Sequence, residues 1–123
     1  MEVHKTLGNE FQEVIYQRCL AIELQQTGIR FQREAEQPLF YKEEHVGTRR
    51  ADFIIEDKLV VELKSVIKLE DVHLSQAKNY LTAYNFDTGL LINFGSASME
   101  YKRIFRSAKS SKSFNPDHPD ADN

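Results

Sequence analysis

Cysteine is almost absent from this 123-residue chain, and tryptophan is absent altogether. Because Cys19 is the only cysteine, the chain can form no internal disulfide and no zinc site built on paired cysteines. The longest apolar run covers residues 89–92, far short of the roughly 20 residues that a membrane-spanning helix needs. The first residues lack the pattern of a cleaved signal peptide. We therefore expect a reduced, cytoplasmic setting and no membrane partner.

Neither sign of charge dominates, since 16 basic residues stand against 19 acidic ones and leave a formal net charge of −3. A chain with this balance lacks the diffuse positive field that drives non-specific binding to phosphates. We therefore expect any binding of nucleic acid to occur through a local site.

The domain organisation follows from length and composition. Apolar residues make up 41% of the chain, which excludes wholesale disorder, and the length corresponds to one domain. We expect this domain to cover residues 1–106. Ser, Lys, Asp, Pro and Asn dominate residues 107–123, which predicts a disordered polar tail.

The first predicted element is a helix from about residue 9 to residue 27, which Gly28 can cap. Its apolar residues recur at helical spacing on two opposite sides, so we expect the helix to be sandwiched between other elements. Cys19 would then pack in the core, and Glu13 would be a partly buried carboxylate.

The rest of the chain predicts strands and a second helix. Alternating segments predict strands over residues 29–33, 39–41, 51–55 and 59–66, with a polar turn over residues 42–47. A helix from Asp71 to about Tyr84, a buried strand over residues 88–94 and an edge strand over residues 101–105 complete the order. We expect a mixed α/β sheet flanked by helices, in which the strand after the second helix runs parallel to an earlier strand.

Two carboxylates fall opposite one another on the hairpin that joins the two middle strands. A three-residue loop pairs Ile55 with Leu59, and counting back places Asp52 opposite Glu62. Lys64 shares their face because strand side chains alternate. Two carboxylates whose Cβ atoms are about 4.5–5.5 Å apart raise each other's pKa unless a cation lies between them.

A divalent cation would relieve this repulsion. Mg²⁺ prefers hard oxygen ligands and is often held by one or two carboxylates and several waters. With Lys64 to orient or deprotonate a water, the cluster has the parts that phosphodiester hydrolysis needs. The alternative is a solvated ion-pair patch on an open sheet face. The apolar residues around Glu62 favour the first interpretation, because they indicate a covered strand where unpaired charges are costly.

These residues resemble a known family. Asp52 followed by Glu62-Leu63-Lys64 is similar to the D…ExK motif of the PD-(D/E)XK nuclease superfamily. Motifs in the same order as in one branch, the GxxExxY proteins, cover roughly residues 5–105: they lie in residues 7–16, 47–52, 61–64, 73–80 and 89–94. The likeness departs at one position. The name motif of that branch has a Gly three residues before its Glu, and this chain has Glu10 in place of that Gly.

The resemblance implies a fold and a set of roles. The fold would be the restriction-endonuclease-like αβββαβ core. Asp52 and Glu62 would bind Mg²⁺, for which Mn²⁺ can substitute, with the Leu63 carbonyl as a further ligand. Lys64 would serve the attacking water, and Glu13 would be an additional acid.

Five further side chains are candidate substrate contacts: Gln76, Tyr80, Arg49, Arg50 and His73. Three of them share one face of the second helix by their spacing, and their alternative role is a hydrogen-bonded face packed over the sheet. The two arginines suit bidentate contact with phosphate, although one alternates inward with Asp52 and has a structural role as its alternative. No second His or Cys lies at ligand spacing from His73, so we do not expect it to bind metal.

We therefore expect a Mg²⁺-dependent nuclease that hydrolyses phosphodiester bonds in DNA or RNA with a metal-activated water. One alternative is a catalytically silent nuclease-fold module that binds nucleic acid or serves as an accessory interaction module. Another is hydrolysis of a small phosphorylated ligand. A homodimer remains an open alternative to a monomer.

Overall fold

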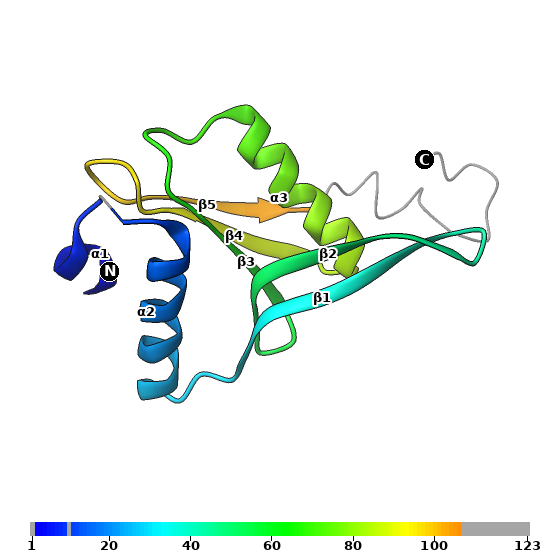
Figure 1. The fold of residues 1–123 in the computed structure, drawn as a ribbon, viewed down its shortest axis with the longest axis horizontal. Helices are drawn as coiled ribbons and strands as arrows, with labels where there is room; N and C mark the ends of the chain where they lie inside the picture. Colours follow the sequence, from blue (N-terminus) through cyan, green and yellow to red (C-terminus); the bar gives the residue numbers. More distant parts are fainter. Residues whose placement is uncertain (1, 10, 107–123) are drawn as a thin grey trace.

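The computed structural model describes residues 2–9 and 11–106 (Figure 1). Glu10 and the predicted tail over residues 107–123 lie outside the described residues. The described elements are α1 (Glu2–Leu7), α2 (Glu13–Gln26), β1 (Phe31–Tyr41), β2 (Glu44–Ile55), β3 (Leu59–Lys64), α3 (Asp71–Tyr84), β4 (Thr88–Asn93) and β5 (Glu100–Phe105). None of these helices has both the length and the apolarity that a membrane crossing requires.

The strands form one sheet in the order β1-β2-β3-β4-β5. β3 and β4 are parallel and are joined through α3, whereas the other neighbouring strands are antiparallel. β1 runs unbroken through Pro38, which an edge strand tolerates because its outer N–H groups need no partner. The predicted mixed α/β sheet with an αβββαβ core is confirmed, with α1 before the core and β5 after it.

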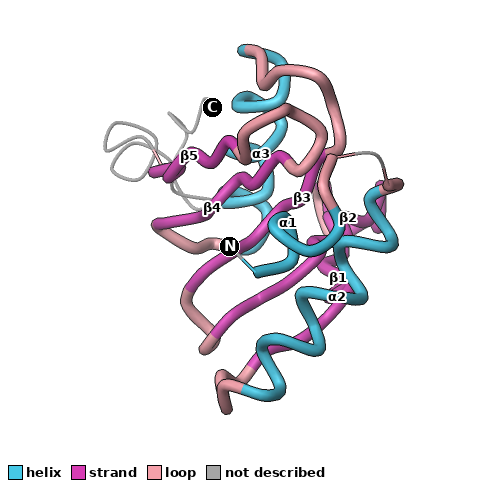
Figure 2. Tube along the Cα trace, turned by 90° about the vertical axis from the view of Figure 1, so that its left-hand side faces the viewer, coloured by secondary structure: helices cyan, strands magenta, loops and turns pink. Residues whose placement is uncertain are grey.

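The sheet separates two groups of helices that cover its opposite faces (Figure 2). α1 and α2 pack on the face where Phe53, Val61 and Leu63 are buried. α3 packs on the other face, against Ile54 and Val60. Successive residues of β3 therefore enter two different cores, and β3 is a central strand that is covered on both sides.

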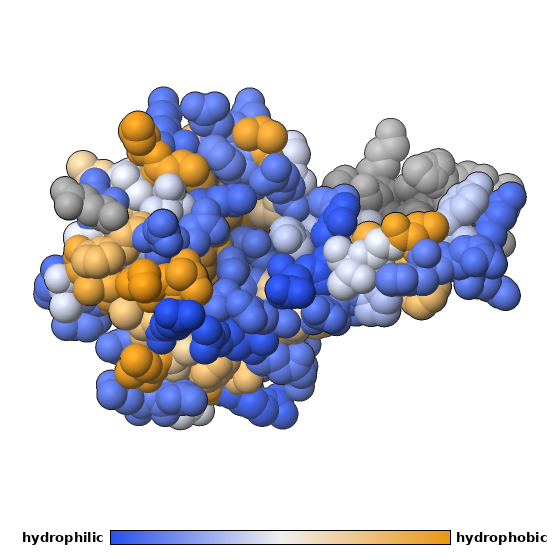
Figure 3. Space-filling model, in the orientation of Figure 1, coloured by the Kyte–Doolittle hydropathy of each residue, from blue (hydrophilic) through white to orange (hydrophobic). Residues whose placement is uncertain are grey.

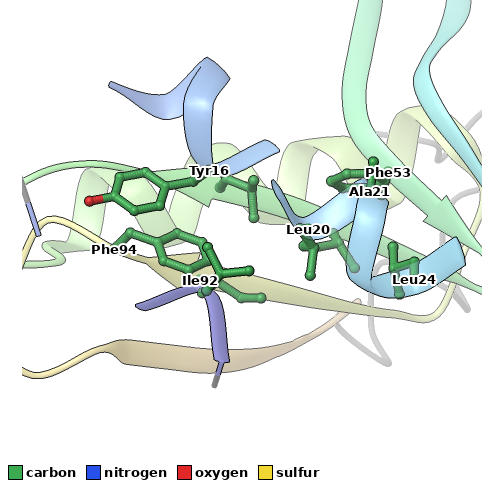
Figure 4. Close-up of a cluster of buried hydrophobic side chains, with 10 residues drawn as sticks. Tyr16, Leu20, Ala21, Leu24, Phe53, Ile92 and Phe94 are labelled. Carbon is green, nitrogen blue, oxygen red and sulfur yellow. The ribbon is translucent and has the colours of Figure 1, made fainter. Parts of the chain in front are cut away.

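The core beneath α2 is built around Tyr16 (Figure 4). Its fully buried ring stacks on Phe94, with ring centroids 4.4 Å apart and planes 9° apart. The hydroxyl donates to Gly8 O at 2.7 Å and accepts from Phe11 N at 3.1 Å, so the buried phenol is fully engaged. Tyr16 thereby fixes the segment between α1 and α2, and α2 begins later than predicted, at Glu13.

Only one side of α2 is buried, so the prediction that this helix is sandwiched between other elements is wrong. Val14 is 38% exposed and Ile22 is 52% exposed, and Figure 3 shows apolar residues gathered at the end of the molecule where α1 and α2 lie. Cys19 is half-buried against the core, and Glu13 is exposed rather than partly buried. No further layer of described residues covers the side of α2 that carries Val14 and Ile22, whereas Glu13 is exposed as the first residue of the helix.

The hairpin formed by β1 and β2 is longer than predicted, and its far half projects from the body of the molecule (Figure 1). The turn expected over residues 42–47 is only the pair Lys42 and Glu43, with φ angles of 49° and 68°, and β2 begins at Glu44. Gly47, which suggested the longer turn, lies inside β2. Two-residue turns with positive φ usually carry Gly, Asn or Asp, so Lys and Glu gave no sign of this turn.

The loop between β3 and α3 is tied to the sheet by two side chains. Asn93 is fully buried, and its Oδ1 accepts hydrogen bonds from Val66 N at 2.9 Å and Gly95 N at 3.0 Å. Its Nδ2 donates to Glu100 Oε1 at 2.9 Å, and the same oxygen accepts from Leu69 N at 2.9 Å. The bond from Asn93, followed by that from Leu69, lowers the pKa of Glu100. The start of α3 is thereby held relative to the end of β3.

We expect Asn93→Ala to destabilise the protein by about 2–4 kcal/mol, because it leaves buried backbone N–H groups without their acceptor. Urea unfolding followed by circular dichroism measures the change. Thr82→Ala on the exposed side of α3 is the control, with an expected change within about 0.5 kcal/mol. An equally small change for Asn93→Ala would contradict the role of this side chain in holding the loop.

Candidate active site

The backbone ladder between β2 and β3 stops one step before Asp52 and Glu62. The pairs within it are Ile55 with Leu59, Ile54 with Val60, and Phe53 with Val61. This register agrees with the predicted three-residue loop and sets the two acids at the next opposing positions.

Side-chain hydrogen bonds take the place of the ladder at Asp52 and Glu62. Asp52 N donates to Glu62 Oε2 at 3.0 Å, and Leu63 N donates to Asp52 Oδ2 at 2.8 Å. Each carboxylate therefore accepts a backbone N–H from the other acid's strand. These bonds fix both headgroups in the gap where the two strands part, which confirms that the two acids lie together.

Glu62 is the most strongly perturbed acid of the site. The residue is only 8% exposed, and burial followed by repulsion from Asp52 raises its pKa to about 8. The hydrogen bond from Asp52 N and the charge of Lys64 act in the opposite direction, and Glu13 adds the smallest repulsion. At neutral pH the carboxyl of Glu62 therefore carries a proton when no cation is bound beside it.

A pocket of about 640 Å³ opens beside the carboxylates, between β2, β3 and α3. Lys64 lies at its edge and donates from Nζ to Gln76 Oε1 on α3 at 3.4 Å. The pocket lining includes Glu62 and Lys64 together with all five predicted substrate contacts, Arg49, Arg50, His73, Gln76 and Tyr80. The fold thus brings residues from three elements to one cavity.

Three of these lining residues also have structural partners. Arg49 donates from Nε to Asn79 Oδ1 at 3.0 Å, a bond that leaves its terminal nitrogens for other partners. Arg50 forms an exposed ion pair with Glu36 at 3.0 Å. His73 Nδ1 accepts the backbone N–H of the residue before α3 at 2.9 Å and so caps that helix. His73 therefore has, in part, the hydrogen-bonded packing role that is the alternative to substrate contact for this face of α3.

Two tyrosines of α3 lie close to the acid pair. Partial burial, followed by the charges of Glu62 and Asp52, raises the pKa of Tyr80. The Tyr84 hydroxyl accepts from Ala51 N at 2.9 Å and donates to the carbonyl of Ala35. Tyr84 thereby anchors the end of α3 to β1 and β2 next to Asp52, a role that sequence reasoning missed.

Gln17 is the residue of α2 that reaches the acid pair. It is 5% exposed, and its Nε2 donates to Asp52 Oδ1 at 2.7 Å. Arg33 donates from Nε to Gln17 Oε1 at 2.8 Å. Sequence reasoning selected Glu13, one turn earlier, and missed Gln17. The sign that could have revealed it is a polar residue next to Tyr16, on the side of the helix that is buried.

Comparisons with known proteins find similarity at the level of the family and of the fold. A family profile described as the PD-(D/E)XK nuclease superfamily matches residues 1–104. No match is found among curated proteins. The crystal structure of SSO0001 is similar with a TM-score of 0.61 and 19% identity, over 80% of this chain and 52% of that chain. An alkaline exonuclease (LHK-Exo) from Laribacter hongkongensis has a TM-score of 0.51 and 10% identity, over 73% of this chain and 54% of that chain. This chain thus spans about half the length of these two proteins.

Nucleases of that superfamily generally use divalent metal ions, and the residues present fit such an ion. Among the described residues, no three His, Cys, Asp or Glu side chains gather into a complete metal site. A hard cation such as Mg²⁺ needs only one or two carboxylates, with water completing its shell. Asp52 and the buried Glu62 supply such a pair. Leu63 directs its N–H toward Asp52, and the carbonyl of a strand residue points to the same side as its N–H.

The raised pKa of Glu62 predicts a pH dependence of stability in chelator-containing buffer. Because the folded-state pKa of about 8 exceeds the ordinary value of 4.5, the stabilising effect of protonation is complete below about pH 4.5. It is lost as the pH rises through about 8. We expect Glu62→Gln to remove this loss. Between pH 5 and pH 9, the free energy of unfolding of the variant should rise by roughly 2–4 kcal/mol relative to that of the wild type.

Urea unfolding at several pH values measures this difference. Glu44→Gln, which removes an exposed carboxylate at the start of β2, is the matched control and should run parallel to the wild type. Parallel curves for Glu62→Gln and the wild type would show that the pKa of Glu62 is not raised.

Proposed function

The chain belongs to the PD-(D/E)XK nuclease superfamily, and we propose that it is a metal-dependent nuclease that hydrolyses phosphodiester bonds in DNA or RNA. The observation that carries the proposal is the acid pair Asp52 and Glu62, whose carboxylates are bound to each other's strands, with Glu62 and Lys64 lining one pocket. The narrower membership of the GxxExxY branch stays a prediction.

We assign the metal site to Asp52, Glu62 and the Leu63 carbonyl, with Mg²⁺ as the ion and Mn²⁺ as a substitute. A bound divalent cation supplies positive charge that stabilises the negative charge developing on a phosphoryl group. Glu62 must release its proton to act as a ligand, so affinity for the cation should rise with pH toward the pKa of about 8. Glu13, exposed on α2, is an additional acid that acts on Glu62 through space.

Lys64 is the residue that we assign to the attacking water. Its ammonium group stands at the edge of the pocket, where Gln76 holds it by a hydrogen bond of 3.4 Å. From there Lys64 can orient a water beside a phosphate bound at the acid pair, and its positive charge can help deprotonate that water by stabilising the hydroxide that forms.

The remaining lining residues are assigned to the substrate. Arg49, Arg50 and His73 bring positive or titratable groups to the pocket of a chain with a net charge of −3. The terminal nitrogens of Arg49 suit bidentate contact with a phosphate. The Tyr80 ring offers a surface for stacking of a base. Recognition would therefore be local, at this pocket, and a homodimer could supply a second such pocket for a duplex.

The second candidate function is a silent module that binds nucleic acid without cleaving it. It is favoured by one observation, that the described residues offer only a two-carboxylate site. The two functions differ in turnover. An assay with labelled single- and double-stranded DNA and RNA, in Mg²⁺ or Mn²⁺, separates them, because the module would bind these substrates but release no product.

We expect Lys64→Met to lower the cleavage rate by about 10²–10⁴-fold without loss of folding, because it removes the group that serves the water. Asp52→Asn should act likewise, since it keeps the shape of a residue that accepts the Leu63 N–H. Lys58→Met, in the exposed turn between β2 and β3, is the control and should cleave like the wild type. Turnover by purified Lys64→Met at the wild-type rate would end the proposal.

A further inference from the structure

Gln17 occupies an unusual position for an uncharged polar residue. It lies on the buried side of α2 between Tyr16 and Leu20, and only 5% of its surface is exposed. Burying an amide is costly unless its groups are hydrogen-bonded. Both ends of this amide are engaged, at 2.7 Å to Asp52 and at 2.8 Å to Arg33.

The chemistry of the two partners fixes which way the amide points. A guanidinium group can only donate, so Arg33 selects Oε1 of Gln17. An ionised carboxylate can only accept, so Asp52 selects Nε2. If the amide were rotated by half a turn, its Nε2 donor would face the Arg33 donor and its Oε1 acceptor would face the Asp52 acceptor. Arg33 therefore holds Gln17 in the one orientation that donates to Asp52.

This chain of bonds acts on Asp52 without neutralising it. Asp52 Oδ1 receives the amide of Gln17 and Oδ2 receives Leu63 N, so each oxygen has one fixed donor and keeps acceptor capacity for another partner. A direct ion pair with Arg33 would instead compete with any cation for the same carboxylate. The Gln17 amide, which lies between Arg33 and Asp52, fixes the orientation of the Asp52 carboxylate but carries no charge.

We propose that Gln17 is a positioning residue that orients Asp52 for a divalent cation, and that Arg33 locks Gln17 in place. The inference rests on the metal-dependent function proposed above and adds residues of α2 and β1 to that site. Residues that hydrogen-bond to metal ligands typically change metal affinity by about 10–100-fold when they are replaced.

The test is Mn²⁺ binding measured by calorimetry on the full chain, with the Mg²⁺ dependence of cleavage as a second measurement. Gln17→Met fills a similar volume without a donor, and we expect about 10–100-fold weaker Mn²⁺ binding. Cleavage should need correspondingly more Mg²⁺ to reach half of its maximal rate. Gln25→Met, exposed near the end of the same helix, is the control and should bind like the wild type.

Arg33→Met tests the lock separately, and because Arg33 is exposed the variant keeps the core intact. We expect it to weaken Mn²⁺ binding less than Gln17→Met does, and Arg33→Lys, which keeps a donor, to restore binding. A merely structural role would lower the melting temperature of these variants and leave their Mn²⁺ affinity unchanged, which would overturn the inference.

The outcomes also separate the inference from the proposed function. Weaker Mn²⁺ binding by Gln17→Met in a protein that cleaves no nucleic acid would support the inference and count against the nuclease. Cleavage with unchanged Mn²⁺ affinity in both Gln17→Met and Arg33→Met would support the nuclease and reject the inference. A wild-type chain that binds no Mn²⁺ would reject the inference together with the metal dependence.

Discussion

The last hydrogen bonds between β2 and β3 are accepted by carboxylates instead of backbone carbonyls. The rest of the site depends on this replacement of carbonyl acceptors by carboxylate acceptors. Asp52 N is bound by Glu62, and Leu63 N is bound by Asp52. Without these acceptors the two N–H groups would be left unpaired where the strands part. The same bonds allow β2 to leave β3 and continue along β1. The pocket, which Glu62 lines, therefore opens beside the point where the two acids are held.

Close approach of two carboxylates has an electrostatic cost that the fold makes larger. β3 is central in the sheet, with Val61 and Leu63 covered by α2 and Val60 covered by α3. This covering removes Glu62 from water and, with Asp52 beside it, raises the Glu62 pKa to about 8. A proton relieves the repulsion in the absence of metal, and a divalent cation would relieve it more fully. The architecture that stabilises the sheet is thus also what perturbs the acid pair to which we assign the cation.

The parts of the site that the sequence predicted are those set by local rules. A three-residue loop fixes the register of a hairpin, and strand alternation then puts Asp52, Glu62 and Lys64 together. The failures concern elements whose environment is tertiary. Two apolar sides of α2 do not reveal which one will be covered. Glu13 lies on the side that is covered, but it is exposed because the helix begins there. The sequence does not reveal Gln17, because a polar residue suggests a solvent-facing position. The pairing of α3 with β2 through Tyr84 is likewise invisible in any local pattern.

A common arrangement links the cationic side chains around the acid pair. Three of them donate to a neutral amide oxygen, Lys64 to Gln76, Arg49 to Asn79 and Arg33 to Gln17, whereas Arg50 pairs with Glu36. Within residues 2–9 and 11–106, none of the ion pairs involves Asp52 or Glu62. An ion pair would satisfy the charges of both partners and leave little for a ligand, whereas an amide orients a cation and keeps its charge available. A carboxylate that suits a cation, Glu62, and two side chains that suit a phosphate, Lys64 and Arg49, therefore line one pocket, as the proposed phosphodiester hydrolysis requires.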